Sequence, residues 1–289
     1  MIRHGVLFAG GTGSRLYPIT QSINKQLLPI YNKPMVFYSL SLFILAKIKS
    51  VTLVCNPKDI DHYLNLLGDG SQLGMKITYK TQSTPNGIPS ALSLANDDIE
   101  DKDILLILGD NILVGNNLRQ SLSVDNSAVA KIFGYKVNDA SQFGVIDFDH
   151  TGAPISIKEK PRNVSKGYAI PGIYFLPNSA ISISKSLLPS TRGETEISDL
   201  LSHYLFGKKL LVEVLGRGVA WLDTGTPDGL AAATNMVQTF ERRQNYQIAN
   251  IHEIAYLNGW ITKADLTSFA NTCAKSEYGK YLLELIDEI

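Results

Sequence analysis

Short, almost wholly apolar runs alternate with helical segments through the first half of the 289-residue chain, and this alternation constrains its fold more than any other feature. The runs lie at residues 5–9, 51–55, 77–79 and 104–108. Continuous apolar strands of this kind are typical of a parallel sheet that is covered on both faces. Residues 34–47 begin with a proline and are apolar on almost every side, which predicts a helix packed against that sheet. We therefore expect a layered α/β fold whose ligands bind beyond the carboxyl ends of the strands.

The second half of the chain adds strands and then ends in helices. Strands are expected at 128–134, 144–148, 155–158, 172–175 and 210–214, with a hairpin turn at 149–152 and helices at 178–186 and 195–206. After Pro227 the pattern is helical to the end of the chain. This arrangement predicts a mixed extension of the same sheet, followed by a C-terminal helical appendage.

Charge and composition exclude several classes of protein. Lys plus Arg and Asp plus Glu both number 27, so there is no basic excess to neutralise a polynucleotide, and we expect no nucleic-acid partner. The longest charge-free apolar stretch falls well short of the roughly 18 residues that span a bilayer. Cys55 and Cys273 form no paired motif, which is typical of a reducing compartment. We expect a cytoplasmic protein with no membrane partner.

A glycine-rich segment follows the first predicted strand. Residues 10–15 read Gly-Gly-Thr-Gly-Ser-Arg, and such glycines let consecutive backbone N–H groups face an oxyanion. The segment lacks the third glycine of a dinucleotide-binding fingerprint and the Gly-Lys-Ser/Thr of a P-loop. It is either a glycine-rich strand exit with a solvated Arg15 or, with Lys25 nearby, a cradle for a polyphosphate.

Charged residues also follow other apolar runs. Asp110 and Asp223 each stand where a carboxylate can hold Mg²⁺ or cap the next segment. The clusters at 159–161 and 192–196 are either solvated turns or parts of the same site. The five histidines show no metal-ligand spacing, and no serine lies in a nucleophile elbow. Zinc chemistry and covalent hydrolase mechanisms therefore have no support in the sequence.

Taken in order, these motifs resemble those of the sugar-1-phosphate nucleotidylyltransferases. The resemblance runs from about residue 3 to residue 285, is closest to the branch that uses dTTP, and rests on the motifs at 10–18, 25–29, 109–111, 159–161, 192–199 and 221–225. It implies a Rossmann-like three-layer mixed sheet of the nucleotide-diphospho-sugar transferase type. It also implies a nucleotidylyltransferase domain at 1–240, with a nucleotide-binding half at about 1–125 and a sugar-binding half at about 126–240, and a helical extension at 241–289.

The resemblance implies that a thymidylyl group passes from dTTP to glucose 1-phosphate, giving dTDP-glucose and pyrophosphate with the help of Mg²⁺. This reaction would open the synthesis of dTDP-deoxysugars such as dTDP-rhamnose for surface polysaccharide. A sugar phosphate has a second pKa of about 6 and needs no general base at pH 7. Such an enzyme has to align two polyanions and offset their charge, which agrees with the lack of a catalytic His or Ser motif.

The resemblance also assigns roles to single residues. Those implied in catalysis are Arg15, Lys25, Asp110, Lys160 and Asp223, of which Asp110 and Asp223 would hold the Mg²⁺. Those implied in nucleotide binding are Gly10, Gly11, Gly13, Ser14, Arg15, Lys25, Gln26, Gln82 and Gly87, with the Gln82 amide offering a donor and an acceptor to the base. Those implied in sugar-phosphate binding are Asn111, Gly144, Glu159, Lys160, Ile170, Tyr174, Arg192 and Glu194. The C-terminal helices resemble ones that mediate tetramer contacts in the family, so a homotetramer is expected.

The chain departs from the family pattern at a few positions. Pro89 and Ser90 stand where Ala and Gln are usual, Phe143 replaces a Tyr, and Ile170-Pro171 replaces Val-Thr. Pro89 removes one N–H and Ser90 shortens a polar side chain near the expected base, and the other changes remove hydrogen-bonding groups near the expected hexose. The remaining alternatives are another nucleotide or sugar 1-phosphate, for example UTP, and a regulatory relative without turnover. Retention of all five implied catalytic residues favours an enzyme.

Overall fold

The computed structural model describes residues 3–84, 86–123, 128–162 and 165–288. Its strands are β1 (Arg3–Ala9), β2 (Pro29–Ile30), β3 (Lys33–Pro34), β4 (Ser50–Cys55), β5 (Lys76–Thr81), β6 (Asp103–Leu108), β7 (Ile112–Gly115), β8 (Ala130–Val137), β9 (Gly144–Phe148), β10 (Pro154–Glu159), β11 (Gly167–Ala169), β12 (Ile173–Leu176), β13 (Leu210–Val214) and β14 (Val219–Leu222). Its helices are α1 (Met35–Leu45), α2 (Ile60–Leu67), α3 (Pro89–Leu94), α4 (Asn96–Ile99), α5 (Leu118–Ser121), α6 (Ala180–Ser186), α7 (Ile197–Phe206), α8 (Pro227–Gln244), α9 (Ile251–Leu257), α10 (Lys263–Thr272) and α11 (Glu277–Glu288).

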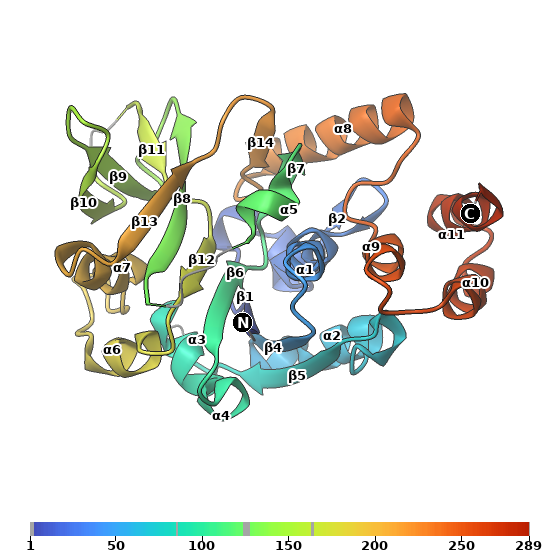
Figure 1. The fold of residues 1–289 in the computed structure, drawn as a ribbon, viewed down its shortest axis with the longest axis horizontal. Helices are drawn as coiled ribbons and strands as arrows, with labels where there is room; N and C mark the ends of the chain where they lie inside the picture. Colours follow the sequence, from blue (N-terminus) through green and yellow to red (C-terminus); the bar gives the residue numbers. More distant parts are fainter. Residues whose placement is uncertain (1–2, 85, 124–127, 163–164, 289) are drawn as a thin grey trace.

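A ten-stranded mixed sheet organises these elements (Figure 1). Its order is β10-β9-β11-β8-β12-β6-β1-β4-β5, with β13 paired to β8. The strands β6, β1, β4 and β5 run parallel, whereas β12 joins β6 antiparallel. The chain passes from β1 to β4 and β5 on one side and then returns to β6 on the other side of β1. The carboxyl ends of β1 and β6 therefore form a topological switch point, where open α/β sheets bind ligands.

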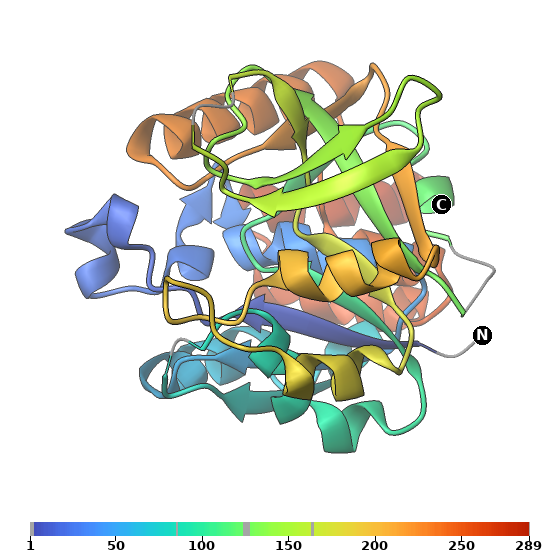
Figure 2. The ribbon, with the colours of Figure 1, turned by 90° about the vertical axis from the view of Figure 1, so that its left-hand side faces the viewer.

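Both faces of the parallel strands are buried, as their continuous apolar sequence predicts. In β1 the neighbours Val6 and Leu7 are both fully buried but belong to different hydrophobic clusters. Val6 packs with residues of α3, α4, α6 and α7, and Leu7 packs with residues of α1, α2 and α9 to α11. Figure 2 shows β1 crossing the molecule from the N-terminus, with the segment that follows it projecting from the far side. The expected three-layer architecture is confirmed.

Most expected elements are present, with shifts at their ends. The helix predicted at 34–47 is shorter, because Pro34 has an extended conformation and Lys47 a left-handed one (φ 58°). The hairpin at 149–152 is confirmed, since the Asp149 N–H donates to the Ala153 carbonyl at 2.9 Å. The sequence did not lead us to expect the strands β2, β3, β7, β11 and β14.

A second, two-stranded sheet pairs segments that are far apart in the chain. Strands β7 and β14 run antiparallel, with Ile112 opposite Leu222 and Leu113 opposite Trp221. Asp110 lies two residues before β7, and Asp223 follows β14 directly. This pairing therefore brings the two carboxylates to the same end of one short ladder.

The helical stretch after Pro227 is confirmed as α8 to α11, the orange and red elements of Figure 1. The predicted division at residue 240 falls inside α8, because that helix continues to Gln244. Ile251, Leu266 and Leu282 from the last three helices lie in the same hydrophobic cluster as α1. The predicted division near residue 125 lies outside the described residues. Among the helices that the structure describes, none has both the length and the apolar character of a membrane span.

Candidate active site

Two adjoining cavities lie at the carboxyl ends of β1 and β6. The first, here called the loop cavity, has a volume of about 300 Å³ and is lined by the glycine-rich segment at 10–15 and by Gln82. The second, here called the sheet cavity, has a volume of about 220 Å³ and is lined by Glu159, Tyr174 and Trp221 among others. The residues common to both are Arg15, Ile88, Asp110 and Lys160. Two cations and a carboxylate therefore stand where the cavities meet.

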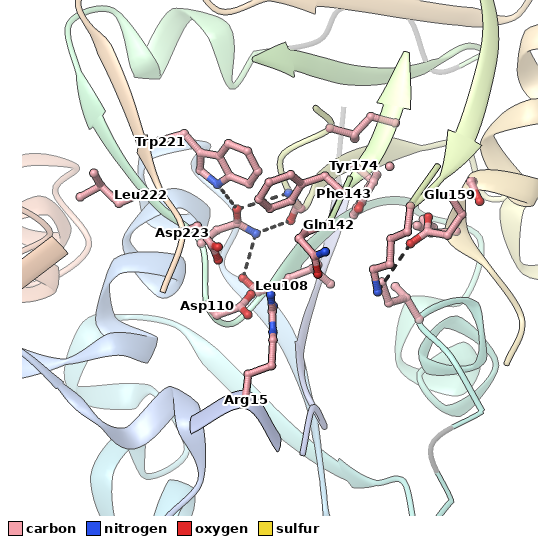
Figure 3. A pocket seen from close by; sticks show the side chains of 18 residues that line it. Arg15, Leu108, Asp110, Gln142, Phe143, Glu159, Tyr174, Trp221, Leu222 and Asp223 are labelled. Atoms are coloured by element: carbon pink, nitrogen blue, oxygen red, sulfur yellow. Dashed lines mark hydrogen bonds and ion pairs between the residues drawn. The ribbon is translucent and has the colours of Figure 1, made fainter. Parts of the chain in front are cut away.

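The glycine-rich segment shapes the loop cavity and positions Arg15. Gly13 has a left-handed conformation (φ 62°), and a Cβ there would lie 2.8 Å from the Thr20 side chain, so only glycine fits without a shift. The Thr20 hydroxyl donates to the Gly13 carbonyl at 2.9 Å. A single 3-10 turn over Ser14–Leu16 follows. Figure 3 shows the Arg15 side chain pointing from this segment toward Asp110.

Lys25 reaches the junction of the cavities from a second turn. It begins a 3-10 turn over Lys25–Leu27, and the Asn24 side chain caps that turn by accepting from the Gln26 N–H at 3.0 Å. Asn24 is buried and donates in turn to Asp59 at 2.7 Å. The Lys25 Nζ donates to Asp110 Oδ2 at 2.6 Å, and only 7% of the Lys25 side chain is exposed. The Lys25 cation is thus fixed beside the Asp110 carboxylate, which follows β6.

Asp110 and Asp223 line the same cavity wall (Figure 3). The Thr224 hydroxyl donates to the Asp110 carbonyl at 3.3 Å, and the Gly225 N–H donates to Asp223 Oδ1 at 2.9 Å. A Cβ on Gly225 would lie 2.5 Å from Arg15 Nη2, so glycine is needed for the guanidinium to approach. Within the described ranges, no three His, Cys, Asp or Glu side chains are grouped so as to hold a metal ion. Two carboxylates nevertheless suit Mg²⁺, which takes its other ligands from phosphates and water.

Asn111, expected at the hexose, has both side-chain polar atoms engaged with protein groups. Its Oδ1 accepts from the Gly172 N–H at 3.2 Å and from Trp221 Nε1 at 3.0 Å, and its Nδ2 donates to the Gly172 carbonyl at 3.0 Å. These bonds join the end of β6 to the residues before β12 and to β14. Phe143, where the resemblance implies a Tyr, packs edge-on against Trp221 with ring centroids 4.9 Å apart. An aromatic wall therefore stands where the sequence predicted a lost hydrogen bond.

Glu159 lies across the sheet cavity from the two aspartates in Figure 3. Its Oε2 is buried and has no hydrogen-bond partner among the described residues. Burial raises the pKa of this carboxyl group above its ordinary value, and the Lys160 and Arg192 cations, each 3.8 Å from Oε1, partly offset that rise. Buried acceptors are normally hydrogen-bonded, so this oxygen is suited to receive a hydroxyl donor from a ligand.

The expected base end of the loop cavity is built from two glutamines. Gln26 is buried, and its Oε1 has no partner among the described residues. The Gln82 Nε2 donates to the Ser90 hydroxyl and to the Gly87 carbonyl, the latter at 3.4 Å. The resemblance implied that the Gln82 amide offers both a donor and an acceptor to the base. In the structure its donor is engaged by Ser90 and Gly87. Pro89 lacks an N–H but begins α3, where no intrahelical donor is needed.

The structure groups the residues that the sequence singled out. All the residues expected at the nucleotide line the loop cavity: Gly10, Gly11, Gly13, Ser14, Arg15, Lys25, Gln26, Gln82 and Gly87. Six of those expected at the sugar phosphate line the sheet cavity: Asn111, Gly144, Glu159, Lys160, Ile170 and Tyr174. The sequence reasoning gave no role to Ile88, Gln142 or Ser198, which also line the sheet cavity. No local sequence signal marks these three positions.

Arg192 and Glu194 lie elsewhere than expected. Both were placed on the sugar side, whereas both line the loop cavity. A backbone hydrogen bond explains this position. The Thr195 N–H donates to the Asn86 carbonyl at 3.0 Å and holds residues 192–195 against the turn at Gly87. Arg192 still reaches toward the sheet cavity through its 3.8 Å contact with Glu159.

Comparisons with known proteins agree with this geometry. A family model described as nucleotidyl transferase matches residues 4–239. A glucose-1-phosphate thymidylyltransferase of Neisseria gonorrhoeae is 45% identical over 98% of this chain and 99% of its own length, and one of Mycobacterium tuberculosis strain H37Rv is 44% identical over the same shares. A crystal structure from Bacillus anthracis, assigned as a glucose-1-phosphate thymidylyltransferase in complex with sucrose, gives a TM-score of 0.75 at 33% identity over 82% of this chain and 95% of that one.

The fold is shared more widely. A UDP-glucose pyrophosphorylase solved with UDP-glucose gives a TM-score of 0.72 at 22% identity over 83% of this chain and 99% of that one. Similarity along nearly the whole chain, together with the matching fold and the grouping of the motif residues in two cavities, confirms the resemblance found in the sequence. The chain belongs to the nucleotidyl transferases, and within them to the glucose-1-phosphate thymidylyltransferase family.

Proposed function

We propose that this protein transfers the thymidylyl group of dTTP to glucose 1-phosphate, with dTDP-glucose and pyrophosphate as products. The observation that carries the proposal is the meeting of two polar cavities at Arg15, Asp110 and Lys160. Two substrates can react there only if their reacting atoms come within about 3–3.5 Å, which adjoining cavities allow. Similarity to glucose-1-phosphate thymidylyltransferases over nearly the whole chain supports this pair of substrates.

In this proposal dTTP occupies the loop cavity. Residues 10–14 cradle the triphosphate, and Arg15 and Lys25 offset its charge. Arg15 also stabilises the pyrophosphate as it leaves. The residues that bound the base are Gln26, Gln82 and Gly87. Arg192 and Glu194 lie at the same cavity wall and complete its polar lining.

Glucose 1-phosphate occupies the sheet cavity. Glu159 accepts from hexose hydroxyls through its unpartnered Oε2, and Lys160 offsets the charge of the phosphate where the two cavities meet. The hydrogen bonds of Asn111 fix the wall between β6 and β12. The other lining residues that shape this wall are Gly144, Ile170 and Tyr174.

The reaction needs no enzyme nucleophile and no general base. A phosphate oxygen of glucose 1-phosphate, already an anion at pH 7, attacks the α-phosphorus of dTTP. The new phosphorus–oxygen bond forms as the bond to the β-phosphate oxygen breaks, and its electron pair leaves with pyrophosphate. The protein supplies alignment and charge compensation, as in other phosphoryl transfers.

Asp110 and Asp223 would hold Mg²⁺. Two carboxylates on one cavity wall are a donor set that suits an ion which keeps phosphate and water ligands. When bound, the ion would offset negative charge on the triphosphate. Lys25, fixed beside Asp110, supplies a further positive charge at the same place.

The wider setting follows from the same resemblance and belongs to the proposal. The enzyme would act in the cytoplasm in the first step of dTDP-deoxysugar synthesis, for example toward dTDP-rhamnose. Its chain would divide into a nucleotide-binding half at about 1–125, a sugar-binding half at about 126–240 and helices at 241–289. It would assemble as a homotetramer through the C-terminal helices.

Pyrophosphate release tests the proposal most simply. The purified protein is incubated with Mg²⁺ and a grid of dTTP, UTP and dCTP against the 1-phosphates of glucose, galactose and mannose. We expect the fastest release with dTTP and glucose 1-phosphate. Absence of release with this pair, or faster release with UTP, would show that the assigned substrates are wrong.

A further inference from the structure

Ser90 contacts the Gln82 side chain, at a position where the resemblance found in the sequence implies a Gln. Gln82 follows β5 directly and only 6% of its surface is exposed, so its amide has few orientations available. The Ser90 hydroxyl donates to the Gly87 carbonyl at 2.7 Å. The Gln82 Nε2 donates both to the Ser90 hydroxyl oxygen and to the Gly87 carbonyl. The three groups form a closed arrangement at the base end of the loop cavity.

The direction of each bond follows from the Gly87 carbonyl, because a carbonyl oxygen can only accept. The Ser90 proton therefore points to this carbonyl, and the lone pairs of the Ser90 hydroxyl are left to accept from Gln82. An amide oxygen in the position of Nε2 would face the Gly87 oxygen at 3.4 Å with no proton between them. The amide nitrogen of Gln82 is thus held on the Ser90 side.

The other half of the amide faces the cavity. Gln82 Oε1 lies 3.1 Å from where a Cβ of Gly10 would stand, and Gly10 lines the loop cavity. With the amide held by Ser90, the site presents a hydrogen-bond acceptor to a base. Thymine and uracil carry a proton on N3 and can donate to it, whereas cytosine has an unprotonated N3 that would be repelled.

We propose that Ser90 is a positioning residue which selects nucleotides with a protonated N3 by locking the orientation of the Gln82 amide. This inference rests on the proposed function, in which the base of the nucleotide meets Gln82. Without the Ser90 hydroxyl the amide loses one of its two locking bonds and can turn its Nε2 toward the cavity. A turned amide donates to the N3 of cytosine and admits it.

The hydroxyl is not required to build the helix that carries it. Ser90 is the second residue of α3, and no side-chain hydrogen bond caps that helix. The buried residues of α3 are Pro89, Ala91 and Leu92, and the last two pack in the same hydrophobic cluster as residues of the sheet. Replacement of Ser90 by Ala therefore leaves the packing of the helix in place.

The test compares Ser90→Ala, Ser90→Thr and the unaltered protein by kcat/KM for dTTP and for dCTP, each with glucose 1-phosphate and Mg²⁺. Ser93→Ala, on the same helix, is the matched control. We expect the preference for dTTP over dCTP to fall about tenfold in Ser90→Ala, the upper effect of one net hydrogen bond. The Thr variant keeps the hydroxyl and should retain the preference, as should Ser93→Ala.

The outcomes separate this inference from the proposed function. Failure of the unaltered protein to turn over dTTP would overturn the proposed function and the inference with it. If the unaltered protein turns over dTTP, but the preference of the Ser90→Ala variant for dTTP over dCTP stays within twofold of the unaltered value, only the role of Ser90 is overturned. An equal fall in kcat/KM for dTTP and dCTP would show that Ser90 only shapes the cavity, and it would contradict a role in nucleotide selection.

Discussion

The two aspartates proposed as metal ligands differ in their surroundings. Asp110 is paired with Lys25, whereas Asp223 is exposed. If both hold the metal ion, Asp223→Asn should lower kcat at least about 100-fold, the usual effect of removing one group that stabilises a transition-state charge. The fold should persist, because Asn keeps the shape of the side chain and its oxygen can still accept from the Gly225 N–H. Steady-state rates and circular dichroism measure the two effects.

The matched control for this change is Asp228→Asn. Asp228 is an exposed residue in the first turn of α8, outside both cavities. Its substitution should leave kcat unchanged. A rate for Asp223→Asn within a few-fold of the unaltered rate would remove Asp223 from the metal site.

Glu159 gives a prediction for the sugar phosphate. Glu159→Gln keeps the shape of the side chain but replaces a charged acceptor by a neutral one, and charged hydrogen bonds are about twice as strong. We expect the KM for glucose 1-phosphate to rise about tenfold or more, and the KM for dTTP to stay within about twofold, since Glu159 lines only the sheet cavity. Equal changes in both KM values would contradict a role for Glu159 in binding glucose 1-phosphate alone.

At the scale of elements, the parallel strands could be predicted from sequence and the pairing of β7 with β14 could not. Strand β6 is apolar at every position from Ile104 to Leu108 because both of its faces are covered, so the signal is local. Strands β7 and β14 have four residues each and join distant segments. Nothing in either segment specifies its partner. The proximity of Asp110 and Asp223 was therefore expected only from the family resemblance.

The candidate site shows the same limit at its side chains. Gly10 and Asp110 meet in one cavity because they follow strands whose carboxyl ends lie at one edge of a sheet, which sequence pattern can indicate. The internal hydrogen bonds of Asn111 and the contact of Ser90 with Gln82 depend on side-chain orientations set by tertiary packing. The sequence therefore located the site but did not predict which polar groups remain available in it.

A buried ion pair joins the β2–β3 hairpin to the C-terminal part of the chain. Lys33 Nζ lies 2.7 Å from Glu241 Oε1, with side-chain exposures of 1% and 6%, and the Ile248 N–H also donates to that oxygen at 2.9 Å. Lys33→Met leaves the carboxylate buried without its cation and should lower the free energy of unfolding by about 3–5 kcal/mol. Urea denaturation of the variant measures this loss.

Two further variants test whether the loss comes from the unpaired charge. Lys33→Met combined with Glu241→Gln removes both charges and should regain at least half of the stability. Lys158→Met breaks an exposed pair with Asp147, whose side chains are 60% and 41% exposed, and should cost at most about 1 kcal/mol. If Lys33→Met lowers the free energy of unfolding no more than Lys158→Met does, the buried pair does not stabilise the contact between the β2–β3 hairpin and the C-terminal part of the chain.

At the scale of the whole molecule, the last helices share the core of the sheet, and a buried histidine ties them together. Tyr278 donates its hydroxyl proton to Asn250 at 2.8 Å, so His252 Nδ1, 2.9 Å from the same hydroxyl, must be the donor in their contact. His252 Nε2 is then the unprotonated nitrogen, and it is buried with no partner among the described residues. Protonation there would place a charge in apolar surroundings.

This arrangement predicts acid sensitivity. Burial lowers the pKa of His252 to about 3, below its ordinary value of 6.5. The folded protein therefore keeps the neutral ring while the unfolded chain takes up a proton, so the stabilisation is complete above pH 6.5 and is lost as the pH falls toward 3. The loss at pH 5 is about 2 kcal/mol for this one group.

His252→Phe should reduce the difference in unfolding free energy between pH 7.5 and pH 5 by about that amount, whatever its effect on absolute stability. His150→Gln, at an exposed turn, should leave the difference unchanged. If His252→Phe and His150→Gln show the same pH dependence as the unaltered protein, His252 is not a source of acid sensitivity.

We propose that glucose 1-phosphate attacks dTTP directly, with the protein supplying only alignment and charge. The stereochemistry at the α-phosphorus tests it most directly, because one displacement inverts that centre and two displacements through an enzyme nucleophile restore it. A single diastereomer of dTTP with sulfur on the α-phosphorus is converted with glucose 1-phosphate, and the configuration of the product is determined by phosphorus NMR. We predict inversion, and retention would contradict direct attack.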